Sequence, residues 1–177
     1  FERDVEHLPV IIQKWMRNSG VLGKEKVVSL RLKQIGTLRT KPEGKWMPFS
    51  ATQYFNVEHP AFVWTTEVDA MYSVNMIGRD KLINGEGAML IKLGSIIPVV
   101  NESDNKKINS GAMVRFLAEI CWFPSTALND HIVWESIDAH SAIATLRIAQ
   151  NSVSGIFKFN SNGDVISFEA DRYYGCS

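Results

Sequence analysis

Residues 79–93 read RDKLINGEGAMLIKL, and this stretch decides the fold class. Asn84-Gly85 is the strongest short hairpin signal in the chain, because both residues tolerate the positive φ angles of a tight turn. Apolar residues flank the pair, at Leu82-Ile83 before it and at residues 88–91 after it. The stretch predicts two antiparallel strands, and Pro98 either ends the second segment or places it at a sheet edge.

Three further strands are predicted before this hairpin, because apolar and polar residues alternate there with a period of two. They cover residues 27–33, 46–57 and 61–69, and turn signals separate them. After the hairpin, residues 132–173 contain turn signals at intervals of about ten residues, which predicts a β-meander of four strands.

Two helices are predicted from apolar residues at spacings of three and four. The first starts near Leu8, and Asn18-Ser19-Gly20 provides its stop signal. The second extends from about Asn109 to Trp122, with Asn109 or Ser110 as its N-cap. The polar residues 101–107 before it are predicted to form a surface loop.

The predicted order is one helix, about five strands, a second helix and about four strands, without regular strand–helix alternation. This order indicates an α+β protein with an antiparallel sheet. Because about nine twisted strands tend to curl, we predict one strongly curved sheet, a half-barrel, with both helices on its concave face.

Length and charge limit the possible functions. The 177 residues suffice for a single domain, predicted to cover residues 1–177. Lys+Arg and Asp+Glu both number 19, and no run of like charges occurs, so nucleic acid is not an expected partner. The chain begins at Phe1 without an initiator Met and stops directly after a strand-like segment, which leads us to expect a fragment of a longer protein.

No pattern in the sequence predicts a metal, a cofactor or an activated nucleophile. The four histidines lack the spacing of a zinc site. Cys121 and Cys176 form no C-x-x-C motif, and Cys121 is interpreted as a buried reduced thiol.

Three charged residues lie in apolar neighbourhoods: Arg79, Asp80 and Glu119. Because an unpaired charge is costly in such surroundings, we predict that Arg79 forms a buried or half-buried ion pair with one of the two carboxylates. Roles in orienting a ligand or in catalysis are the alternatives.

Large aromatic side chains are frequent, and core packing is the simplest reason for them. A curved sheet under two short helices should nevertheless leave an apolar cavity of a few hundred Å³. Its expected lining includes Trp64, Met113, Phe116 and Trp122.

Four segments carry a resemblance to a known family: WMPFSATQYF at residues 46–55, GRD at 78–80, RFLAEICWFP at 115–124 and VSGIFKF at 153–159. They resemble an uncharacterised bacterial family that is known only as a domain of unknown function. The resemblance implies no catalytic residue. It does imply a hydrophobic segment before Phe1 and further strands after Ser177, and therefore membrane association at the cell envelope through residues outside this chain.

The order of elements is also similar to that of LolA and LolB, lipoprotein carriers in which a half-barrel covered by helices binds acyl chains. Our leading hypothesis is a non-enzymatic carrier or sensor of a lipophilic small molecule. The alternatives are a hydrolase or isomerase that uses Arg79, Asp80 or Glu119, and a protein-interaction module. The predicted ligand-binding residues are Trp64, Arg79, Asp80, Met113, Phe116, Glu119 and Trp122.

Overall fold

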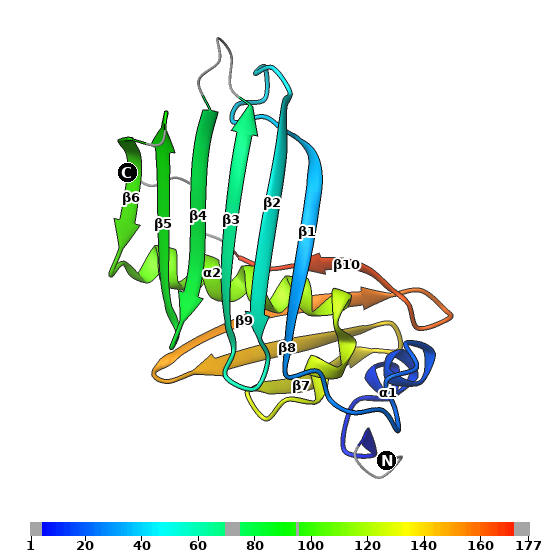
Figure 1. Ribbon diagram of the computed structural model, residues 1–177. Coiled ribbons are helices and arrows are strands. Elements are labelled where there is room, and N and C mark those ends of the chain that lie inside the picture. Colours follow the sequence, from blue (N-terminus) through cyan, green and yellow to red (C-terminus); the bar gives the residue numbers. More distant parts are fainter. Residues whose placement is uncertain (1–4, 70–74, 95, 172–177) are drawn as a thin grey trace. The chain divides into compact units, whose positions relative to one another are not determined.

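Two β-sheets carry the fold, and they occupy different parts of the chain (Figure 1). The computed structural model describes residues 5–69, 75–94 and 96–171. The chain divides into two compact units: unit 1 contains residues 1–28 and 113–177, and unit 2 contains residues 29–112.

Sheet A, in unit 2, has six antiparallel strands, and each strand pairs with the next one along the chain. Short turns between the strands favour this sequential order. The strands are β1 Ser29–Leu38, β2 Met47–Asn56, β3 Ala61–Asp69, β4 Asn75–Ile83, β5 Glu86–Leu93 and β6 Ile97–Ser103.

The hairpin predicted around Asn84-Gly85 is confirmed as the β4–β5 connection. Asn84 has a φ angle of 53° and Gly85 one of 80°, both in the left-handed region that a type I′ turn requires. Pro98 lies opposite Lys92 in the edge strand β6, next to a register shift. Its missing N–H therefore interrupts no interior ladder.

One face of sheet A carries the buried side chains. Phe55, Phe62 and Leu82 occupy matching positions in β2, β3 and β4, and all three are buried. The ring centroids of Phe55 and Phe62 lie 6.1 Å apart. Every residue of the edge strands β1 and β6 is exposed or half-buried, so the central strands supply most of the buried surface.

Helix α2 spans Lys106–Glu119 and starts earlier than predicted. Asn105 is the capping residue, because its Oδ1 accepts a hydrogen bond from the backbone N–H of Lys107 at 2.9 Å. The predicted caps at Asn109 and Ser110 are therefore wrong. The polar residues 101–107 complete β6 and begin α2, since an edge strand and an exposed first helical turn both tolerate polar side chains.

Gly87 positions the first half of α2 on sheet A within unit 2. A Cβ atom at this position would lie 2.6 Å from the carbonyl oxygen of Ile108 and 3.0 Å from the Cβ of Ala112. The backbone N–H of Gly87 donates to Asn109 Oδ1 at 2.8 Å. Glycine is therefore required at position 87 by the close approach of α2, whereas Asn84 and Gly85 form the hairpin turn.

Sheet B, in unit 1, is the predicted four-strand β-meander. Two short 3₁₀ turns, η3 Ile120–Trp122 and η4 Pro124–Leu128, connect α2 to it. The last strand was predicted to reach Tyr173, which lies outside the described residues. The strands are β7 Ile132–Asp138, β8 Ser141–Ile148, β9 Asn151–Phe159 and β10 Val165–Glu169.

Helix α1, Val10–Asn18, packs on sheet B through one aromatic side chain. The ring of Trp15 lies 6.1 Å from Trp134 of β7, and 6.0 Å and 5.9 Å from Phe157 and Phe159 of β9. Pro9 precedes the first helical residue, and Gly20 follows the helix with a φ angle of 66°, as the predicted boundaries require.

The α+β class and the antiparallel pairing are confirmed, but the strands do not form one sheet of about nine strands. The ten described strands form a six-stranded and a four-stranded sheet, and neither is closed. The alternation of apolar residues shows which face of a strand is buried, whereas the neighbours of each strand depend on pairing that alternation does not encode.

Candidate ligand-binding groove

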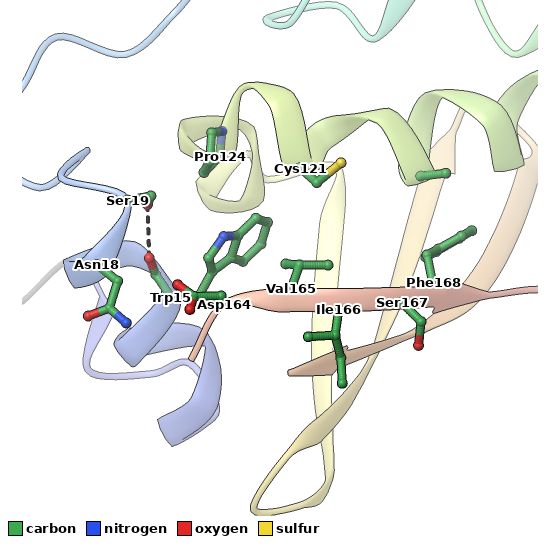
Figure 2. Close-up of a pocket in the computed structure, with 11 residues that line it drawn as sticks. Trp15, Asn18, Ser19, Cys121, Pro124, Asp164, Val165, Ile166, Ser167 and Phe168 are labelled. Atoms are coloured by element: carbon green, nitrogen blue, oxygen red, sulfur yellow. Dashed lines mark hydrogen bonds between the residues drawn. The ribbon is translucent and has the colours of Figure 1, made fainter. Parts of the chain in front are cut away.

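A pocket of about 530 Å³ lies in unit 1 between three elements (Figure 2). The C-terminal end of α1 forms one side, the end of α2 with η3 and η4 forms the second, and β10 forms the third. We call this pocket the β10 groove. Its lining consists of Trp15, Asn18, Ser19, Ala118, Cys121, Pro124 and residues 164–168.

Trp15 forms a rigid apolar part of the groove. Only 5% of its surface is exposed. The rings of Trp134, Phe157 and Phe159 contact it, and Trp134 is itself held by a hydrogen bond from Nε1 to the carbonyl oxygen of Ala127 at 2.9 Å. Because these rings fix the indole, this wall is preorganised to bind an apolar group.

A β-bulge in β10 brings two apolar side chains to the groove. The register of β10 against β9 shifts between Val165 and Ser167, which leaves Ile166 outside the regular ladder. In a regular strand, Val165 and Phe168 would point to opposite faces, because they are three residues apart. With the extra residue of the bulge, both point toward α2 and η3 (Figure 2).

Phe168 depends on a glycine in the neighbouring strand. Its ring packs edge-on against Phe157 with centroids 4.8 Å apart. A Cβ atom at Gly155 would lie 2.3 Å from two atoms of this ring. Gly155 therefore leaves the space in which Phe168 reaches both the core and the groove.

Cys121 contributes a half-buried thiol to the lining. Burial raises the pKa of this thiol above its ordinary value, and the nearby charge of Glu119 also raises it, while backbone hydrogen bonds act in the opposite direction. Since the thiolate is the nucleophilic form, the raised pKa makes Cys121 a weak nucleophile at neutral pH. It acts as a small apolar wall residue.

Polar groups gather at one end of the groove, where α1 ends and β10 begins (Figure 2). Ser19 Oγ donates to the carbonyl oxygen of Trp15 at 2.8 Å. Asn18 Nδ2 donates to the carbonyl oxygen of Asn162. Asp164 Oδ2 accepts from Asn160 Nδ2 at 2.9 Å.

Thr126, within η4, has an unsatisfied hydroxyl. The residue is fully buried, and its Oγ1 has no hydrogen-bond partner in the part of the chain that the structure describes. It lines neither the β10 groove nor the second pocket. Such a group destabilises the fold, because its desolvation is not offset.

A second pocket of about 710 Å³ lies elsewhere in unit 1. It combines charged side chains, including Lys26 and Asp130, with apolar ones such as Leu8 and Ile132. Its mixed lining fits a lipophilic group less well than the aromatic wall of the β10 groove does.

Three of the predicted site residues lie in sheet A of unit 2. Asp80 is 8% exposed and lies opposite Trp64 in the ladder between β3 and β4. Trp64 Nε1 donates to Gln34 Oε1 at 2.7 Å. Arg79 is exposed, because successive residues of β4 point to opposite faces.

The predicted ion pair of Arg79 is wrong, since Arg79 has no carboxylate partner among the described residues. Glu119 instead accepts a hydrogen bond from Arg115 Nε, one helical turn earlier, at 2.9 Å. Arg79 is exposed to solvent, so its charge requires no partner in the fold.

The other predicted residues lie in unit 1. Met113 and Phe116 are fully buried in α2, and Phe116 packs edge-on against Phe123 with centroids 6.3 Å apart. Trp122, in η3, is 52% exposed. None of the seven predicted residues lines the β10 groove, and their joint role in a ligand site stays a prediction.

Sequence reasoning missed the groove because it treated β10 as a regular strand. One signal was present: Val165 and Phe168 are large apolar residues at a spacing of three, which does not fit the period of two. Such a spacing within a strand is typical of a bulge.

Neither a metal site nor a membrane-spanning helix is found among the described residues. Across residues 5–69, 75–94 and 96–171, no three His, Cys, Asp or Glu side chains gather in an arrangement that could hold a metal ion. Over the same residues, no helix has the length and apolar character needed to cross a membrane.

The comparisons with known proteins agree with the resemblance found in the sequence. No curated protein matches the chain. No solved structure matches it. The model of one family matches residues 1–177, and the chain therefore belongs to that family, which is described as a family of unknown function (DUF6544).

Proposed function

We propose that this chain is a non-enzymatic protein that binds a lipophilic small molecule, whose alkyl or acyl chain occupies the β10 groove. The observation that carries the proposal is the apolar wall of this groove, which Trp15, Val165 and Phe168 form beside Ala118 and Cys121. A volume of about 530 Å³ lies within the range of small-molecule sites.

The groove also has the rigidity that a binding site needs. Trp15 and Phe168 contact the same core residue, Phe157, so both walls rest on the interior of sheet B. A wall that is ordered before binding loses little conformational entropy when the ligand enters, which favours affinity.

The element order supports a carrier as well. A helix, six strands, a second helix and four strands follow one another along the chain. This order is similar to that of the carriers LolA and LolB. Curvature of a sheet around its ligand, as in a half-barrel, and tethering at the cell envelope are part of the proposal.

The geometry favours an enzyme less. Arg79 and Asp80 point to opposite faces of β4, and Glu119 is paired with Arg115. A catalytic pair needs both groups within reach of one reacting atom, and the opposed directions of Arg79 and Asp80 do not provide this.

A protein-interaction module is the second candidate, because the edge strand β6 exposes apolar side chains. Ile97 and Val99 are 60% and 54% exposed. An edge strand of this kind offers unpaired backbone groups together with apolar surface to an added strand.

Binding of Nile red, an uncharged lipophilic dye, tests the proposal. The wild-type protein should bind the dye and enhance its fluorescence. Ala118→Phe, which fills the groove, should weaken binding about tenfold, because the dye loses the volume that it occupies. Ala139→Phe is the matched control, since Ala139 is exposed in the β7–β8 turn.

Melting curves of both variants show whether the fold is intact. Alkylation of Cys121 in a Cys176→Ser background gives a second readout, because an occupied groove should slow the reaction. Absence of dye binding to the wild type, or equal binding by Ala118→Phe, would rule out the β10 groove as the site. Self-association that a charged substitution at Val99 abolishes would then favour the interaction module.

A further inference from the structure

The β10 groove has one apolar end and one polar end. Phe168 and Cys121 lie toward one end, and Asn18, Ser19 and Asp164 lie at the other (Figure 2). A molecule that fills the groove would therefore be amphiphilic, with its chain beside Phe168 and its head group beside Asp164.

Most of the hydrogen-bond donors of the side chains at the polar end already bind acceptors within the protein. The hydroxyl hydrogen of Ser19 goes to the carbonyl oxygen of Trp15 or Met16, at 2.8 Å and 3.2 Å. Ser19 Oγ therefore offers lone pairs only. Asn18 uses one of its two N–H groups on the carbonyl oxygen of Asn162 and retains the other N–H and its Oδ1 acceptor.

The loop before β10 has used its backbone donors in the same way. Asn160 Oδ1 accepts from the backbone N–H groups of Asn162 and Asp164, both at 2.9 Å. The N–H of Gly163 donates to the carbonyl oxygen of Asn160 at 2.9 Å. An anion site in a loop needs such N–H groups free, and this loop directs them inward.

The charges around the polar end also disfavour an anionic head group. Asp164 places a carboxylate there. Its Oδ2 accepts a hydrogen bond from Asn160 Nδ2. The C-terminal end of α1, with the partial negative charge of its carbonyl groups, is adjacent. Lys14 and Arg17 are not part of the groove lining. Lys14 Nζ donates to the carbonyl oxygen of Ser161 in the loop before β10, and Arg17 Nη2 donates to Gln13 Oε1.

We infer that the ligand of the β10 groove has an uncharged or cationic head group that donates hydrogen bonds, such as a hydroxyl, an amide or an ammonium group. A carboxylate or phosphate head group meets acceptors and a like charge, so its burial is not offset. This inference rests on the proposed function, because it assumes that an alkyl chain occupies the apolar end.

Displacement of Nile red by three compounds with the same number of carbon atoms tests the inference: n-dodecylamine, n-dodecanol and dodecanoate. The amine and the alcohol should displace the dye at concentrations about tenfold lower than dodecanoate, since they supply donors to the acceptors of the polar end. Asp164→Asn should weaken the amine about threefold and the alcohol less, as expected for one exposed charge.

Asp130→Asn, in the second pocket, is the matched control and should change none of the three values. The amide that replaces the Asp164 carboxylate retains an acceptor for Asn160, so the loop before β10 should keep its conformation. Melting curves of both variants check that the fold is intact. Equal displacement by all three compounds, or an unchanged amine value in Asp164→Asn, overturns the inference and leaves the proposed function intact. If neither the dye nor any of the compounds binds, both proposals fall.

Discussion

Sheets A and B have the same sequential antiparallel topology, yet their buried faces differ chemically. The buried face of sheet A includes Gln53, Thr66 and Asp80 among its apolar residues. The buried face of sheet B is dominated by aromatic and aliphatic side chains, with Phe157 at the centre of several ring contacts. The alternation of apolar residues alone therefore does not reveal which sheet offers an apolar binding surface.

The reason lies in what each face contacts. A polar side chain is tolerated on a buried face where a partner is available, as for Thr66 Oγ1, which donates to the carbonyl oxygen of Ser50 at 2.9 Å. Aromatic rings stabilise a face through packing area instead, and they form rigid walls. The aromatic face is the one that adjoins the β10 groove.

The largest expected effect comes from the centre of the aromatic face. Phe157→Ala should lower the free energy of unfolding by about 3–5 kcal/mol, because it leaves a cavity between Trp15, Trp134 and Phe168. Ile35→Ala in sheet A, at a side chain that is 89% exposed, should change it by less than ~0.5 kcal/mol. Urea unfolding of both variants gives the comparison, and similar losses would show that burial of the Phe157 ring is not what stabilises the aromatic face.

Glycines that allow close packing should show a smaller effect. Gly155→Ala in sheet B displaces the ring of Phe168, and Gly87→Ala in sheet A meets the backbone of α2, so each should cost about 1–3 kcal/mol. Gly155→Ala should also reduce Nile red binding, whereas Gly87→Ala should leave it unchanged.

Gly36→Ala is the matched control. Gly36 lies in the edge strand β1, and its new Cβ atom would lie 3.1 Å from the ring edge of Phe49 in β2. This contact is with a side chain, which can shift to make room. The three variants are compared by urea unfolding. A loss for Gly36→Ala as large as for the other two would mean that the close contacts of Gly87 and Gly155 are not the cause.

The smallest expected effect compares two buried threonines. Thr126→Val should raise the free energy of unfolding by about 1 kcal/mol, because it removes a buried hydroxyl without a partner among the described residues. Thr66→Val should lower it by about 1 kcal/mol, because it breaks the bond to Ser50. For a chain of this length, each change corresponds to a shift of about 2–4 °C in Tm. A Tm change of the same sign in both variants would contradict the assignment of Thr126 as unsatisfied.

Local signals in the sequence were enough to predict the class of the fold and most of its elements. The hairpin at Asn84-Gly85, the antiparallel pairing, the first helix and the meander follow from turn residues that need a positive φ and from apolar residues at periods of two or 3.6. The membership of the family was also visible in short motifs along the chain.

The division of the strands between two sheets and the position of the groove depend on tertiary contacts instead. Arg79 was expected to pair because its neighbours are apolar, but it points to solvent, and this direction depends on the register of β4. Val165 and Phe168 line one groove because a bulge, defined by the pairing of β10 with β9, turns both to the same side. Local patterns encode the conformation of each segment, whereas register, bulges and neighbours arise from contacts between segments far apart in the chain.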